Sequence, residues 1–201
     1  MRSVTPDQDQ TDGEDGSAGG YEYRTMTLEA FADTIIPGEK RAPDDRAIAG
    51  ASTGPGAVEA GAIELLETPA TGISDGLDNY VTALNEHAQA HAAAQGRALD
   101  ATLPPFVALP FEHRTAVVSA LTGPGHPEKE LWILLALFSN MAFDTAAHMH
   151  TADAIAAGHP FFTSMGFALP DADGLWRFPD FSYGRPLART HPDTTPTGSP
   201  A

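Results

Sequence analysis

The sequence predicts an all-α protein, a single small bundle of about five helices with an irregular, aromatic-rich C-terminal arm. Apolar residues recur at helical spacing in several segments, and no segment shows the alternation of apolar and polar residues that marks a half-buried strand. The segments between them are rich in glycine and proline, which is typical of loops. With 201 residues, of which 42% are hydrophobic, the chain has room for one domain with a packed core.

Helices are expected at residues 27–36, 57–67, 75–94, 110–121 and 128–156, with loops at 38–56, 68–74 and 122–127. Thr27 is the expected N-cap of the first helix. Pro37 ends this helix, because proline has no N–H to donate and disfavours helical geometry at the residue before it. The apolar stripe of the helix consists of Leu28, Phe31, Ala32, Ile35 and Ile36. The second helix restarts near Ala57, after a Gly-Pro-Gly hinge.

The three later helices carry their own start signals and apolar faces. Ser74 is the expected N-cap of the third helix, and Pro110 opens the fourth at a position that tolerates its missing N–H. The third helix turns Leu77, Tyr80, Val81, Leu84 and Ala88 toward the core. The fifth is apolar nearly all round from Leu131 to Phe138, which predicts a central helix surrounded by the others.

The two ends of the chain differ in composition from this helical domain, which is expected to span residues 21–160. Residues 1–20 are acidic, rich in glycine and poor in apolar residues, so we expect them to be disordered, as we do residues 189–201. Between them, residues 161–188 form the expected arm. Its rings are Phe161, Phe162, Phe167, Trp176, Phe178, Phe181 and Tyr183. Aromatic side chains of this density either anchor a partner protein or fold back over the bundle that carries them.

Charge and cysteine content exclude several classes of function. The net charge of −16 repels nucleic acids and anionic membrane surfaces, so neither is an expected partner. The absence of cysteine excludes disulfides, thiolate metal sites and cysteine-ligated iron–sulfur clusters. No apolar run is long enough to span a membrane, and no twin arginine or signal-peptide core is present near Met1. A cytoplasmic location is the default expectation, with export only in complex with a signal-bearing partner.

Two histidine groups on predicted helices are the candidates for a metal site. His87 and His91 lie one turn apart on the third helix, and Asp144 and His148 lie one turn apart on the fifth. Two such pairs facing each other would suit zinc, manganese or iron in a helical bundle. The alternative is that Asp144 and His148 form an ordinary hydrogen-bonded pair one turn apart, since no Glu-x-x-His motif is present. No phosphate loop, Rossmann glycine motif or nucleophile elbow is found, so the sequence predicts no catalytic residue and no cofactor site.

Two short motifs carry a resemblance to a known family. They are Ile35-Ile36-Pro37 at the end of the first helix and Pro55-Gly56-Ala57-Val58-Glu59-Ala60-Gly61 at the restart. This pair resembles subunit 3 of gluconate 2-dehydrogenase, the small accessory subunit of flavin-dependent oxidoreductases of the glucose–methanol–choline type, or a related uncharacterised branch from high-GC bacteria. The resemblance is specific over about residues 26–66.

The resemblance implies a non-catalytic small subunit or maturation partner that stabilises a large flavoprotein, with FAD in the partner. Many members of that family carry an export signal, and the residues that follow Met1 predict none here. The alternatives from the residues are a stand-alone helical metalloprotein or metalloenzyme using the His/Asp group, and a homodimer that exchanges the aromatic arm.

Overall fold

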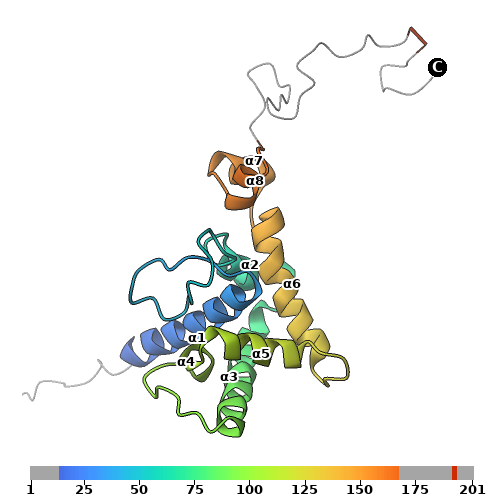
Figure 1. Ribbon diagram of the computed structural model, residues 1–201. Coiled ribbons are helices and arrows are strands. Elements are labelled where there is room, and N and C mark those ends of the chain that lie inside the picture. Colours follow the sequence, from blue (N-terminus) through green and yellow to red (C-terminus); the bar gives the residue numbers. More distant parts are fainter. Residues whose placement is uncertain (1–13, 168–191, 194–201) are drawn as a thin grey trace, which may run out of the picture.

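The computed structural model describes residues 14–167 and 192–193, and over these residues the protein is all-α, as predicted (Figure 1). The described part contains no strand. Its helices are α1 (Glu14–Ile35), α2 (Ala62–Glu67), α3 (Leu77–Ala94), α4 (Pro105–Ala108), α5 (Phe111–Leu121), α6 (Lys129–Thr145), α7 (Thr151–Ala156) and α8 (Pro160–Ser164). Two 3₁₀ turns, Pro69–Thr71 and Ser74–Gly76, connect α2 to α3.

The core lies where α1, α3, α4 and α6 meet. Phe31 of α1 packs against Phe106 of α4 and Trp132 of α6, with ring centroids 6.5 and 6.3 Å apart. Asn85, buried on α3, ties these elements together. Its side-chain nitrogen donates to the Thr27 hydroxyl at 3.3 Å, and its side-chain oxygen accepts the N–H of Phe106 at 2.9 Å. A buried amide with both ends bonded fixes the relative positions of three helices.

Helix α1 is longer than the sequence predicts. It begins at Glu14 rather than Thr27, and so includes residues 14–20, for which disorder was expected. Thr27 is therefore not an N-cap: its hydroxyl donates to the carbonyl of Tyr23 at 2.9 Å, one turn earlier in the same helix. The first part of α1 projects from the bundle in Figure 1. Once nucleated on a packed core, a helix extends with one hydrogen bond per added residue.

The two family-like motifs meet backbone to backbone. The N–H of Glu39 donates to the carbonyl of Gly54 at 2.9 Å, and the N–H of Ala57 donates to that of Ile36 at 3.0 Å. A Cβ at Gly56 would lie 2.5 Å from the nitrogen of Gly38, and a Cβ at Gly38 would lie 2.7 Å from the nitrogen of Gly56. Only glycine fits at these two positions, so the motifs serve to bring the ends of the 38–56 loop together.

The expected second helix is shorter than predicted. Residues 57–61 form turns, and α2 begins at Ala62 behind Gly61, which has a φ of 91°. Helices α3 and α5 agree closely with the predictions 75–94 and 110–121. The four-residue helix α4 was not predicted.

The prediction of one central helix over 128–156 was wrong in two respects. Helix α6 ends at Thr145, where buried Ala146 takes a left-handed conformation with a φ of 48°, and the chain restarts as α7 and α8. Helix α6 also runs along one side of the bundle rather than through it (Figure 1). Within the described residues, only one of its faces is covered.

Candidate functional site

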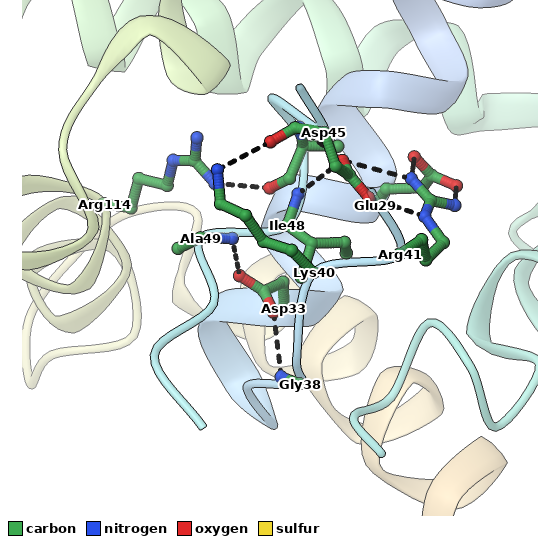
Figure 2. A network of polar contacts seen from close by, with 10 residues as sticks. Glu29, Asp33, Gly38, Lys40, Arg41, Asp45, Ile48, Ala49 and Arg114 are labelled. Atoms are coloured by element: carbon green, nitrogen blue, oxygen red, sulfur yellow. Dashed lines mark hydrogen bonds and ion pairs between the residues drawn. The ribbon is translucent and has the colours of Figure 1, made fainter. Parts of the chain in front are cut away.

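A buried polar network joins the 38–56 loop to α1 and α5 (Figure 2). Asp33, which is only 1% exposed, accepts the N–H of Gly38 at 3.0 Å with one oxygen and the N–H of Ala49 at 2.8 Å with the other. Burial raises the pKa of Asp33, and the two N–H donors act against this shift by favouring the ionised form. Asp33 thereby fixes the beginning of the loop and a point near its middle to the last turn of α1.

Arg114 holds the same loop from the side of α5. It is 4% exposed, and its guanidinium donates to the carbonyls of Ala47 at 2.6 Å and Arg46 at 3.0 Å in the loop. It also donates to the carbonyls of Val107 at 2.6 Å and Leu109 at 2.9 Å, at the end of α4. Burial lowers the pKa of Arg114 to about 10, which leaves it charged at neutral pH.

Arg41 completes the network on the outer side of the loop. Its guanidinium forms a bidentate pair with Glu29 of α1, with the longer contact at 2.8 Å, and donates to Asp45 at 2.7 Å. These hydrogen bonds raise the pKa of Arg41. An open cleft of about 490 Å³ lies beside the pair, bordered by Tyr21 and Met26. Because Arg41 pairs the loop residue Asp45 with Glu29 of α1, we interpret the network as a scaffold that shapes the loop.

The uncovered face of α6 has a different chemistry. On this face Ile133 and Leu137 are 43% and 48% exposed, whereas Leu131, which is 51% exposed, lies on another side of the helix. Ile133 and Leu137 are one turn apart, and the same line continues to Asn140 and Asp144, where the Asn140 amide donates to the Asp144 carboxylate at 2.7 Å. Two exposed aliphatic side chains one turn apart, Ile133 and Leu137, form an apolar stripe of the kind found at interaction sites.

The start of the predicted aromatic arm is partly folded onto its own domain. Phe162 is buried beside Ala146 and Ala154, and the ring of Phe161 contacts that of Phe143 on α6 with centroids 6.3 Å apart. Phe167 is 40% exposed. The structure thus supports the fold-back interpretation for Phe161 and Phe162. The other proposed interface residues, Trp176, Phe178, Phe181 and Tyr183, lie outside the described residues.

The four predicted metal ligands do not come together. His87 Nε2 is 2.9 Å from Glu128 Oε2 at the beginning of α6, whereas Asp144 lies near the other end of that helix. At 1.5 Å per residue the two ends are about 24 Å apart, so no ion can bridge them. His91 contacts His113 of α5 at 2.9 Å instead.

His148 lies beyond the end of α6, so it does not form the expected helical pair with Asp144. Its ring rests directly on Gly61, where a Cβ would overlap it, and burial lowers its pKa. The nearby His159 Nε2 lies 3.1 Å from the carbonyl of Ala60 and 3.0 Å from that of Ala142. These two rings pack α2 against the end of α6, which is a structural role.

Sequence reasoning missed a different cluster of potential metal ligands, formed by His87, His126 and Glu128. The hydrogen bonds from His87 and from the Trp132 indole lower the pKa of Glu128. The signal that could have identified this group is the triplet His126-Pro127-Glu128 immediately before α6. His126 and Glu128 are both potential metal ligands, and the rigid proline between them keeps them close together whatever the position of α3.

The comparison with known families concerns nearly the whole chain. Residues 22–201 match the family described as "Family of unknown function (DUF5987)". The chain belongs to this family. The match includes the polar network, the α6 face and both histidine groups. Searches among curated proteins and among solved structures find no significant match.

None of the helices in the described residues is both long enough and apolar enough to cross a bilayer.

Proposed function

We propose that this protein is a non-catalytic small subunit, or a maturation and stabilising partner, of a flavin-dependent oxidoreductase of the glucose–methanol–choline type. The observation that carries the proposal is the uncovered face of α6. Exposing large aliphatic side chains to water is unfavourable by about 25 cal/mol per Å² of apolar surface, and a partner that covers them recovers this free energy. A face of this kind is typical of a protein that works in a complex.

The identity of the partner rests on the two motifs that resemble the accessory subunit family, Ile35-Ile36-Pro37, which Gly38 follows directly, and residues 55–61. The packing of Gly38 against Gly56 gives these motifs a role in shaping the 38–56 loop, because the close approach requires both glycines. The same loop is fixed from two sides by Asp33 and Arg114. A rigid, acidic scaffold with an apolar face and no assigned catalytic group fits a subunit that clamps a larger enzyme.

The contact surface has a second part at the end of α8. Met165 and Phe167 are 49% and 40% exposed there, close in sequence to the segment that carries Trp176 and Phe178. Aromatic residues are favoured anchors in protein interfaces. We therefore include the exposed end of α8, with Phe167, in the proposed interface.

The proposal is tested by producing this chain together with a flavin-dependent oxidoreductase of the same organism, chosen by gene neighbourhood. We expect the two to co-purify, with flavin absorbance in the large subunit and none in the small chain purified alone. The large subunit produced alone should lose flavin or activity faster on warming than the complex does. An unrelated flavoprotein of the same type serves as the control. If the neighbouring enzyme neither binds this chain nor changes stability in its presence, the proposal is wrong.

A further inference from the structure

The strongest unassigned cluster of ligand-type side chains lies at the junction of α3 and α6. His87 comes from the middle of α3, His126 from the turn before α6, and Glu128 from the N-cap position of α6. One potential ligand atom from each residue lies within 4.8 Å of the other two. The rings of His87 and His126 are arranged edge to face, with centroids 5.6 Å apart.

We propose that His87, His126 and Glu128 bind one divalent transition-metal ion, with Zn²⁺ as the best-fitting ion. Two imidazoles and one carboxylate are a common ligand set for zinc and for neighbouring first-row metals. His87 Nε2 and Glu128 Oε2 are 2.9 Å apart. Two ligand atoms that each lie about 2.0–2.1 Å from one ion are roughly 3.3–3.4 Å apart at the tetrahedral angle of zinc, so this pair has to open by only about 0.4 Å.

The carboxylate is already held in place by a group that would not bind the metal. The indole N–H of Trp132 donates to Glu128 Oε2 at 3.1 Å, and Trp132 is itself only 1% exposed. The His87 ring also packs edge to face on Trp132, with centroids 5.9 Å apart. Such supporting contacts orient ligands before the ion arrives and are a regular feature of metal sites.

Binding would cost little of the existing structure. The Nδ1 of His126 accepts the N–H of Glu128 at 3.2 Å. Coordination through Nδ1 replaces this hydrogen bond, and coordination through Nε2 requires a proton on Nδ1, so either mode gives up one contact. At His87 the ion would take the place of the proton shared with Glu128. The side chains of His87 and Glu128 are 34% and 41% exposed, which leaves room for water as a further ligand.

The test uses the full purified chain, freed of metal with a chelator and titrated with Zn²⁺ alone in a calorimeter. Co²⁺ serves as a spectroscopic substitute, because its visible absorption reports nitrogen and oxygen ligands. We expect one equivalent to bind. His126→Ala and Glu128→Gln should each weaken binding by at least about 10-fold. Glu128→Gln keeps an oxygen that can accept from Trp132, so the fold is retained. The chain has no cysteine, so thiolates cannot account for binding.

His150→Ala is the matched control, since it removes an exposed histidine at the start of α7, outside the cluster. It should bind Zn²⁺ like the wild-type chain. Circular dichroism checks that every variant is folded. The proposal is overturned if the wild-type chain binds no ion, or if folded His126→Ala and Glu128→Gln bind as tightly as the His150→Ala control.

Discussion

Replacing Arg114 by methionine tests whether the polar network holds the 38–56 loop. Methionine replaces the unbranched stem of arginine but has no guanidinium group and donates no hydrogen bond, so four carbonyl oxygens would lose their shared donor. Water cannot easily replace the guanidinium, because the residue is 4% exposed and its partners Ala47, Val107 and Leu109 are buried. A buried acceptor without a donor costs about 1–3 kcal/mol.

The net effect is smaller than four such costs, since burying a guanidinium is itself unfavourable by several kcal/mol. Removing one side of a buried charged network typically destabilises by about 3–5 kcal/mol. We therefore expect Arg114→Met to lower the free energy of unfolding by about 3–4 kcal/mol. For a chain of this size this corresponds to a fall in Tm of roughly 6–16 °C.

Urea unfolding followed by circular dichroism measures this directly. Arg114→Lys should recover only part of the loss, because a single ammonium cannot reach all four carbonyls. Arg97→Met is the matched control: Arg97 is exposed, and its replacement should change stability by no more than about 0.5 kcal/mol. A loss below about 1 kcal/mol for Arg114→Met, or equal losses for both methionine variants, would refute the reasoning.

Two further variants test the loop from other directions. Gly56→Ala should lower the free energy of unfolding by about 2 kcal/mol or more in the same urea assay, because its Cβ would meet the backbone of Gly38, which cannot move aside. Gly72→Ala is the control: its Cβ would meet nothing within 4 Å, although φ is 72°, so it should lower the free energy of unfolding by less. Asp45→Asn should reduce the amount of stability that the protein loses as the pH falls into the acid range. Burial raises the pKa of Asp45, but hydrogen bonds from Arg41 and the nearby N–H groups outweigh burial and place it below the ordinary value of 3.8. The ionised group therefore stabilises the fold above the unfolded pKa, and this contribution is lost as pH falls through the lower folded value. Unfolding curves between about pH 5 and 3 should show a smaller decline for Asp45→Asn than for the wild type, and parallel declines would contradict this assignment.

Much of the helical content could be predicted because its signals are local. Pro110 sets the beginning of α5, and the sequence after Leu121 ends it with Gly123 and Pro124. The apolar spacing of α3 likewise needs no knowledge of its neighbours. These patterns are properties of a single segment, so they survive folding unchanged.

The end of α6 could not be predicted, because nothing local stops the helix there. Residues 146–150 contain no glycine or proline. The stop depends on Ala146, a non-glycine residue held at a φ of 48° and fully buried. The packing of α7 and α8 around Ala146 imposes that conformation, which the spacing of apolar residues in the sequence cannot predict.

The position of α6 was misread for a related reason. A helix that is apolar all round predicts burial on every side, yet Ile133 and Leu137 are exposed in the described structure. Composition reports how much apolar surface exists but not which element covers it. The same residues that made the helix look central make it a candidate interface.

The predicted metal site is not formed, and the polar network and the His87, His126 and Glu128 cluster were not predicted, because all three depend on how the helices are placed relative to one another. Spacing correctly put His87 and Asp144 on helices, but His87 of α3 lies beside the beginning of α6, whereas Asp144 lies near the end of α6. Asp33 and Arg114 reach partners far along the chain, and neither lies in a recognisable motif. Only the triplet at His126 left a local signal.

The central claim is that the uncovered face of α6 binds a flavoprotein partner, and one affinity measurement tests it most directly. The purified chain is titrated into the purified flavin-dependent enzyme of the co-expression test, as the wild type, as Leu137→Glu and as Ala90→Glu. Ala90 is exposed on α3, so its variant adds the same charge to a different surface. We predict that Leu137→Glu weakens binding by about 10-fold or more while Ala90→Glu binds normally. Equal affinity of all three proteins, or no binding by the wild type, would contradict the claim.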